Sequence, residues 1–205
     1  NESTWIAQRN GRTKDGDDKT QVAVLKMFAM SSSRPFAENL AEMNIAPIAV
    51  SYEYEPCDAL KTQEVYLLRK NGTYTKTANE DLNSIVTGIR QFKGSISYTF
   101  CPPITETELA SCQEAPHKER FRLLAEIIDR RIYSGYRLFK TNYMAYDLLE
   151  GTHRFAQQYS DEDLKEFISY TDERTSSLEG DRDELQKIFL GIYANPVRNC
   201  IDNNI

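Results

Sequence analysis

The alternation of apolar and polar residues predicts two β-strands in this chain. One face of segment 45–56 carries apolar and aromatic side chains, namely Ile48, Val50, Tyr52 and Tyr54. Segment 95–103 repeats the alternation with Ile96, Tyr98 and Phe100. A period of two residues places such side chains on one side of a half-buried strand. A third, shorter strand is predicted at 5–8, where an apolar run precedes a basic segment.

Helical spacing of apolar residues fills the segments between these strands. The pattern predicts helices over 19–30, 56–70 and 79–90, because apolar side chains recur there every three or four residues. Strands and helices therefore alternate as far as residue 104. This order favours an α/β fold, a sheet flanked by helices, over an all-helical bundle.

Beyond residue 104 the pattern is helical only. The apolar stripe of segment 119–133 consists of Phe121, Leu124, Ile127, Ile128 and Ile132. Ser160 followed by Asp163 predicts a capped helix start, and a further stripe covers 183–193, with Pro196 expected to end that helix. The chain is therefore expected to divide into an α/β part, 1–104, and an all-helical C-terminal extension, 105–205, packed on it.

Charge and length narrow the classes of protein that this chain can represent. The net charge of −6 argues against a nucleic-acid-binding protein, which usually carries a basic stripe. No apolar run approaches the roughly 18 residues that span a bilayer. The four cysteines lack a Cys-x-x-Cys pair and are predicted to be core thiols of a cytoplasmic protein rather than two disulfides. Because the chain begins at Asn1, it is expected to be part of a longer protein.

The segment WIAQRNGRTKDGDD, at 5–18, concentrates the polar chemistry of the chain. Gly11 and Gly16 have the separation of a phosphate-binding Walker loop, but the residues that follow are aspartates instead of Lys-Ser/Thr. A calcium loop beginning at Asp15 would need a carboxylate at position 26, which is a lysine. Two interpretations stay open: a solvated loop, or an anion site in which a glycine turn presents guanidinium groups.

Neither a metal site nor a nucleophile is indicated. The two histidines, His117 and His153, have no partner at metal-ligand spacing and are predicted to lie on the surface. No Gly-x-Ser-x-Gly elbow is present. The acidic clusters at 161–163 and 181–184 stand at predicted helix starts, where they complement the helix dipole.

The order of these features resembles the glycerolipid acyltransferase family, which acylates lysophosphatidic acid and related acceptors. The resemblance is closest to the branch common in Bacteroidetes-type bacteria, which carries a helical C-terminal extension. It rests on QRNGRTKDG, a helix, and a strand that opens NIAPIAVSYEY, together with YDLLEG at 146–151 and YANPVRN at 193–199. It therefore covers about residues 3–104 as the second half of a catalytic domain, plus the extension.

The resemblance implies roles for two groups of residues. Gly11 and Arg12 match the glycine and arginine of the family's third block (Phe-Pro-Glu-Gly-Thr-Arg-Ser), whose arginine holds the acceptor phosphate. Arg9 and Lys14 would assist, while Asn10 stands where the block has glutamate and the block's threonine has no counterpart. The fourth block, a strand that lines the acceptor or acyl pocket, is matched by Ile45, Pro47 and Ile48.

The family's His-x4-Asp block has no match here, so the resemblance implies a general base upstream of Asn1 and an inactive fragment. The implied activity is O-acyl transfer, without cofactor or metal, from acyl-CoA or an acyl carrier protein thioester to a lysophospholipid hydroxyl in phospholipid biosynthesis. These substrates imply a cytoplasmic protein with peripheral contact to the inner face of the cell membrane. Two alternatives stay open: transfer to a phosphate-free hydroxy or amino-acid lipid, and a non-catalytic binding or scaffold module.

Overall fold

A computed structural model describes residues 3–9, 13–30 and 32–205. Within these residues the protein is mostly helical, with one small two-stranded sheet. The strands are β1 (Ile48–Tyr52) and β2 (Ile96–Phe100). The helices of the first half are α1 (Val22–Ala29), α2 (Phe36–Glu42), α3 (Asp58–Asn71) and α4 (Glu80–Arg90). Those of the second half are α5 (Glu106–Glu114), α6 (Arg120–Gly135), α7 (Lys140–Glu150), α8 (Asp161–Ser176) and α9 (Arg182–Asp202), with a 3₁₀ turn, η1, at Ala156–Gln158.

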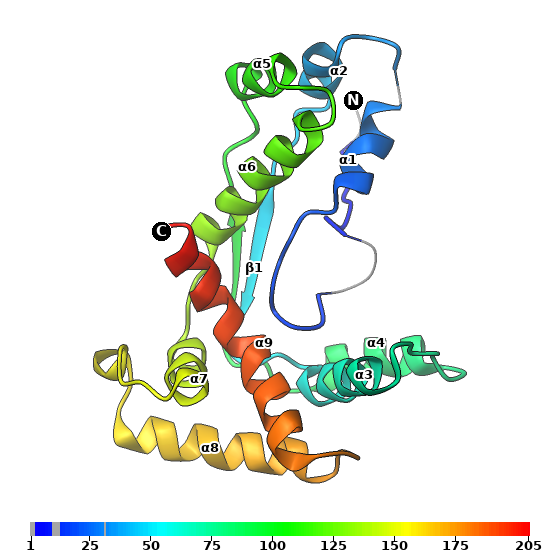
Figure 1. Cartoon of the computed structure of the whole chain (residues 1–205). Helices are drawn as coiled ribbons and strands as arrows, with labels where there is room; N and C mark the ends of the chain where they lie inside the picture. Colours follow the sequence, from blue (N-terminus) through cyan, green and yellow to red (C-terminus); the bar gives the residue numbers. More distant parts are fainter. Residues whose placement is uncertain (1–2, 10–12, 31) are drawn as a thin grey trace.

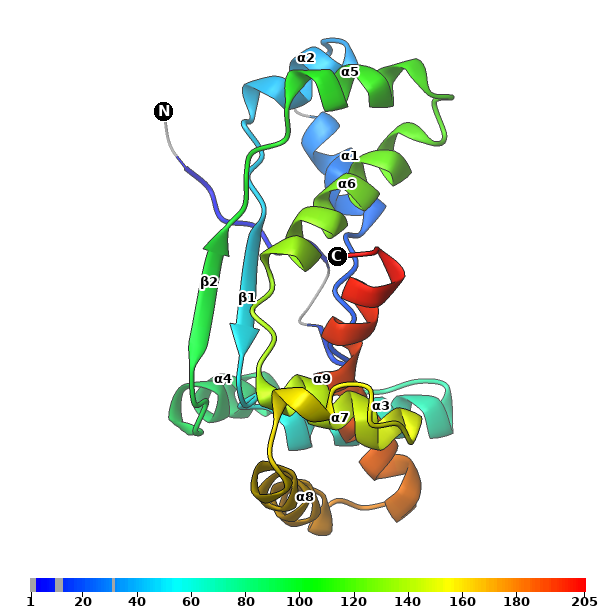
Figure 2. The ribbon, with the colours of Figure 1, turned by 90° about the vertical axis from the view of Figure 1, so that its left-hand side faces the viewer.

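The sheet is antiparallel and has one face toward the core. Ile48 pairs with Phe100 and Tyr52 with Ile96. The end of α6 approaches the sheet closely, since a Cβ at Gly135 would touch the Ala49 side chain. Figure 2 shows β2 at the outer edge of the molecule, while β1 lies between β2 and the helices.

The helices gather at two ends of an elongated molecule. Helices α1, α2, α5 and α6 form one end, around a core that includes Leu25, Leu40, Leu109 and Leu124 (Figure 1). Helices α3, α4, α7 and α8 lie at the opposite end, and α9 runs from that end toward the middle. Elements from both sides of residue 104 share these cores, because α6 packs on β1 and α9 packs on α3.

Several predicted elements are confirmed. The two alternating segments are strands, and helices occupy the core of each predicted helical segment. Ser160 accepts a hydrogen bond from the Asp163 amide at 3.1 Å, so the predicted capping box is present. All four cysteines are buried thiols, and both His117 and His153 are exposed as predicted.

Two predictions of local structure are wrong. Segment 5–8 is not a strand: Trp5 and Ile6 are exposed, and the Gln8 carbonyl accepts a hydrogen bond from Gln21 at the start of α1 rather than from a strand. Pro196 does not end the last helix, which continues to Asp202. Val197 and Cys200, which follow the proline, are buried, and such tertiary packing supplies most of the stability of a helix in a protein.

Candidate functional site

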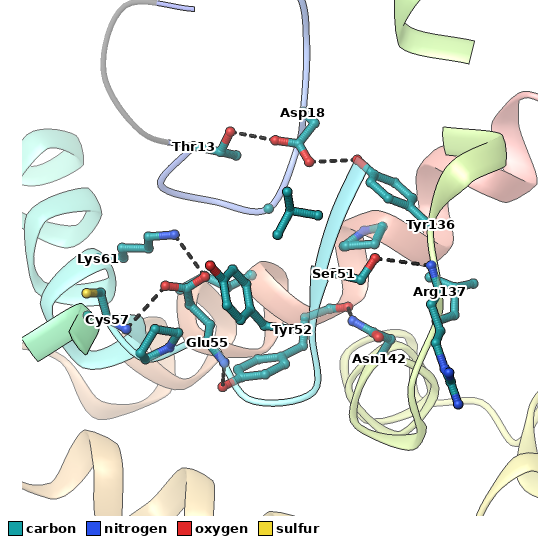
Figure 3. Close-up of a pocket in the computed structure, with 18 of the residues that line it drawn as sticks. Thr13, Asp18, Ser51, Tyr52, Glu55, Cys57, Lys61, Tyr136, Arg137 and Asn142 are labelled. Atoms are coloured by element: carbon teal, nitrogen blue, oxygen red, sulfur yellow. Dashed lines mark hydrogen bonds and ion pairs between the residues drawn. The ribbon is translucent and has the colours of Figure 1, made fainter. Parts of the chain in front are cut away.

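A cavity of about 490 Å³ lies where the loop that precedes α1 meets β1, α3, α4 and α9. Its apolar lining includes Val50, Ile85, Ile89 and Ile192. Its polar lining includes Asp18, Ser51, Glu55 and Lys61, together with Tyr52, Tyr136 and Asn142. Figure 3 shows that the polar side chains come from segments far apart in the sequence and surround a common space. A space lined by both apolar and polar side chains is suited to an amphiphilic ligand.

The loop at 13–18 borders this cavity and is fastened to α9. Thr13, Gly16 and Asp18 line the cavity, and Asn195 Nδ2 donates a hydrogen bond of 2.7 Å to the Asp15 carbonyl. This is the part of WIAQRNGRTKDGDD that directly follows Arg12 in the sequence. The described end of the motif therefore borders a cavity.

Gly16 lies against α9 at the point where Pro196 interrupts the hydrogen bonding of the helix. A proline lacks an N–H, so Pro196 leaves the carbonyl of Ile192 without its usual helical hydrogen bond. Gly16 has φ of +74° and lies against this carbonyl so closely that a Cβ would collide with it. The loop thus approaches α9 where the hydrogen bond is missing, and only a glycine fits there.

Tyrosine hydroxyls orient the Asp18 carboxylate at the edge of the cavity. Tyr136 donates to Asp18 Oδ2 at 2.7 Å and Thr13 donates to Asp18 Oδ1 at 2.5 Å. The Tyr133 hydroxyl donates to the Asp18 carbonyl at 2.7 Å. Burial, and then the nearby Asp18 carboxylate, raise the pKa of Tyr136 far above its ordinary value. Tyr136 therefore remains a neutral hydrogen-bond donor at physiological pH.

Of the residues predicted to bind phosphate, the structure describes only Arg9 and Lys14. Asn10, Gly11 and Arg12 lie outside the described residues. Lys14 forms an ion pair with Glu64 on α3. Arg9 donates from Nη1 to the Asp17 carbonyl at 3.4 Å, and its Nε is buried without a hydrogen-bond partner within the described chain. Both assisting cations thus already have partners within the protein.

Of the residues predicted to line the pocket, Ile48 begins β1, and Ile45 and Pro47 precede it in the chain. Ile45 packs against the core formed with α6, and Pro47 is buried with its carbonyl accepting from the Cys101 amide at 2.9 Å. In the described chain neither they nor Ile48 border the cavity, which β1 lines through Val50 and Ser51 instead. The strand was identified correctly, but the cavity lies at its other end.

Sequence reasoning missed the pair formed by Glu55 and Lys61. The Lys61 ammonium lies 3.1 Å from Glu55 Oε2, and the two side chains are 13% and 18% exposed. Tyr52 lies beside them, and burial raises its pKa to about 12, with the neighbouring Tyr98 as the next cause. A carboxylate six residues before a lysine, across the start of a predicted helix, was the only available signal.

The described residues contain no group of three or more His, Cys, Asp or Glu side chains that could hold a metal ion. Within that same part of the chain, no helix is long and apolar enough to cross a membrane. Neither a family model, nor a curated protein, nor a solved structure matches this chain. The geometry of the cavity and the sequence motifs therefore carry the functional argument.

The two motifs of the extension, YDLLEG and YANPVRN, contact each other. Glu150 of the first forms an ion pair with Arg198 of the second. The Asp147 carboxylate accepts hydrogen bonds of 2.6 to 2.9 Å from four donors: the Thr152 and Tyr159 hydroxyls and the Arg154 and Phe155 amides. The ion pair thus joins α7 to α9, the helix that holds the loop at 13–18, while Asp147 holds the turn after α7 in place.

A second buried carboxylate fixes α9 below the cavity. Asp58 is fully buried and accepts from the hydroxyls of Tyr170 and Tyr193 at 2.6 and 2.8 Å. Arg174 Nε donates to it at 2.9 Å, so one carboxylate joins α3, α8 and α9. Tyr193 also accepts from the Glu55 amide at 3.1 Å, which links this network to the wall of the cavity.

Proposed function

We propose that this protein is an O-acyltransferase of the glycerolipid acyltransferase family, moving a fatty acyl group from an acyl thioester to the hydroxyl of a lysophospholipid. The observation that supports this most is the cavity itself: the loop following Arg12 and an apolar wall border the same space. An acceptor with a charged head and an acyl chain needs both kinds of surface. The family motifs quoted above suggest the chemistry, and a cavity lined by both kinds of side chain is compatible with it.

The proposed reaction is a direct attack without a covalent enzyme intermediate. A histidine upstream of Asn1 would take the proton of the acceptor hydroxyl. The resulting oxygen nucleophile forms a bond to the acyl carbon, the carbon–sulfur bond breaks, and the thiol of the donor leaves with a proton. Arg12 would hold the acceptor phosphate so that the hydroxyl meets the base. The cavity would keep the acyl chain out of water.

The test is an acyl-transfer assay on the product of the whole gene. With an acyl thioester and lysophosphatidic acid, the Arg12→Ala protein should show an acceptor KM at least tenfold higher than that of the original protein, as expected for loss of a charge-assisted contact. Arg182→Ala, which removes an arginine of the exposed surface, serves as the matched control. Equal KM values for Arg12→Ala and the control would remove Arg12 from this role, and absence of turnover with every lipid acceptor would reject acyl transfer.

A phosphate-free acceptor is the second candidate function. It is favoured by the ion pair of Lys14 with Glu64, since this cation is already engaged within the protein. Comparing lysophosphatidic acid with a hydroxy lipid and an amino-acid lipid in the same assay separates the two candidates. Turnover that is faster with the phosphate-free acceptors would favour the second.

A further inference from the structure

Lys61 has free donor capacity directed into the cavity. Its side chain is mostly buried near the start of α3, and Glu55 is its ion-pair partner at 3.1 Å. An ammonium group has three donors, and a single carboxylate contact uses only part of them. Figure 3 shows the nitrogen of Lys61 pointing toward the middle of the cavity. A ligand oxygen could therefore reach Lys61 without Glu55 leaving.

The other cations around the site are engaged elsewhere. Arg137 also lines the cavity, but its guanidinium lies 5.5 Å from the centre of the Phe139 ring and points away from the cavity in Figure 3. Lys14 is paired with Glu64. Of the described residues that line the cavity, Lys61 is thus the cation whose charged group faces the space.

Glu55 is held in place independently of Lys61. Its Oε1 accepts from the Cys57 amide at 3.2 Å, and its own amide donates to the Tyr193 hydroxyl at 3.1 Å. A largely buried ion pair contributes little net stability, because desolvation of both charges offsets their attraction. A charge pair in the wall of a cavity is therefore better explained by ligand recognition than by folding.

The apolar residues that line the cavity could contact the apolar part of the ligand. Val50 lies in the cavity, and Ile85 and Ile89 of α4 continue from it onto the outer surface, where Ile89 is 72% exposed. Leu82 and Phe92 extend this exposed apolar surface. A chain that begins at Lys61 can follow these side chains out of the cavity, with no need for the cavity to enclose its whole length.

We propose that Lys61 is the phosphate-binding residue of this cavity, and that its ligand is a phosphate-bearing amphiphile whose acyl chain lies along Val50, Ile85 and Ile89. The inference rests on the proposed function for the lipid nature of the ligand. It adds a cation that the sequence motifs did not indicate. The phosphate could belong to the lysolipid acceptor or to the thioester donor, and the experiment distinguishes these two sources.

The test measures binding to the present chain by titration calorimetry, with lauroyl lysophosphatidic acid and monolauroylglycerol below their critical micelle concentrations. The original chain should bind the phosphate lipid at least tenfold more tightly, as expected for a charge-assisted contact. Lys61→Met should abolish this preference and leave the affinity for monolauroylglycerol within about twofold. Lys140→Met, which breaks the exposed ion pair with Asp163, is the matched control and should keep the preference.

Glu55→Gln separates recognition from a purely structural role. If Lys61 binds phosphate, removing the competing carboxylate should tighten binding of lauroyl lysophosphatidic acid several-fold. If the pair only stabilises the fold, Glu55→Gln should lower the melting temperature and weaken both lipids equally, which would overturn the proposal. Unchanged affinity of Lys61→Met for both lauroyl lysophosphatidic acid and lauroyl-CoA would overturn it as well.

The source of the phosphate follows from one further ligand. If lauroyl-CoA binding depends on Lys61 and lauroyl lysophosphatidic acid binding does not, the phosphate belongs to the donor; the reverse result assigns it to the acceptor. Binding requires no turnover, so failure here is distinct from failure of the acyl-transfer assay. Selective binding through Lys61 in a protein without transferase activity would support this site and reject the proposed function.

Discussion

Helices α3 and α4 are neighbours in the sequence, yet their surroundings differ completely. Asp58, Thr62 and Tyr66 of α3 are buried beneath α8 and α9. None of the residues of α4 is buried, although its apolar side chains gather on one face. Leu82 and Ile89 of that face are 59% and 72% exposed. The pattern of a helix thus tells which face is apolar but not what covers it, and here both the covered and the uncovered helix border the cavity.

The largest loss of stability is expected from a substitution in the buried helix, α3. Asp58→Ala leaves Arg174 and two tyrosine hydroxyls without their buried acceptor. Losing one partner of a buried ion pair costs about 3–5 kcal/mol, so the free energy of unfolding should fall by that amount in urea titrations. Asp81→Ala breaks an exposed ion pair at the start of α4 and should change it by less than about 1 kcal/mol. Similar losses in both variants would contradict the comparison.

A slightly smaller loss of stability should follow when a buried apolar side chain of α9 is shortened. Leu185 is 2% exposed and packs in the small core that α9 forms with α3. Leu185→Ala should lower the free energy of unfolding by about 2–5 kcal/mol, through lost burial and the cavity left behind. Chemical denaturation measures the change. A loss below 1 kcal/mol would mean that α9 is not firmly packed at this end.

Asp147 should make stability depend on pH. Burial opposes its ionisation, but the hydrogen bonds from Thr152, Phe155 and Tyr159 outweigh burial and hold the pKa of Asp147 below its usual value. Its contribution is therefore complete above the pKa of the unfolded chain, about 4, and is lost as pH falls through the lower pKa of the folded state. Asp147→Asn should cost about 1–3 kcal/mol at pH 7 and flatten the profile below pH 4. An unchanged profile would contradict this role.

The smallest change in stability is expected from a substitution in the exposed helix, α4. Ile89→Ser on α4 should alter the free energy of unfolding by no more than about 0.5 kcal/mol, because the side chain is already in water. It should nevertheless lower the binding of hydrophobic dyes and weaken lipid binding, since Ile89 lines the cavity. A large loss of stability would show that something covers α4 in solution.

Elements defined by local sequence were predictable, and those defined by distant partners were not. The Ser160 cap and the apolar stripe of α9 follow from residues a few positions apart, and both were predicted. The continuation of α9 past Pro196 was not, because it depends on the burial of Val197 and Cys200 against segments far away in the sequence. The same holds for the site. The segment at 13–18 was recognisable from its local composition, whereas Lys61 could be recognised only once the cavity around it was known.

The attachment of the loop at 13–18 to α9 also governs when the site can form. Asp15 and Asn195 are 180 positions apart, so a ribosome that adds about 5–20 residues per second needs roughly 9–36 s to make the second after the first. During that time the loop has been synthesised but its anchor has not. The wall of the cavity is thus completed among the last events of biosynthesis, and a nascent chain that stalls before α9 carries the motif without the site.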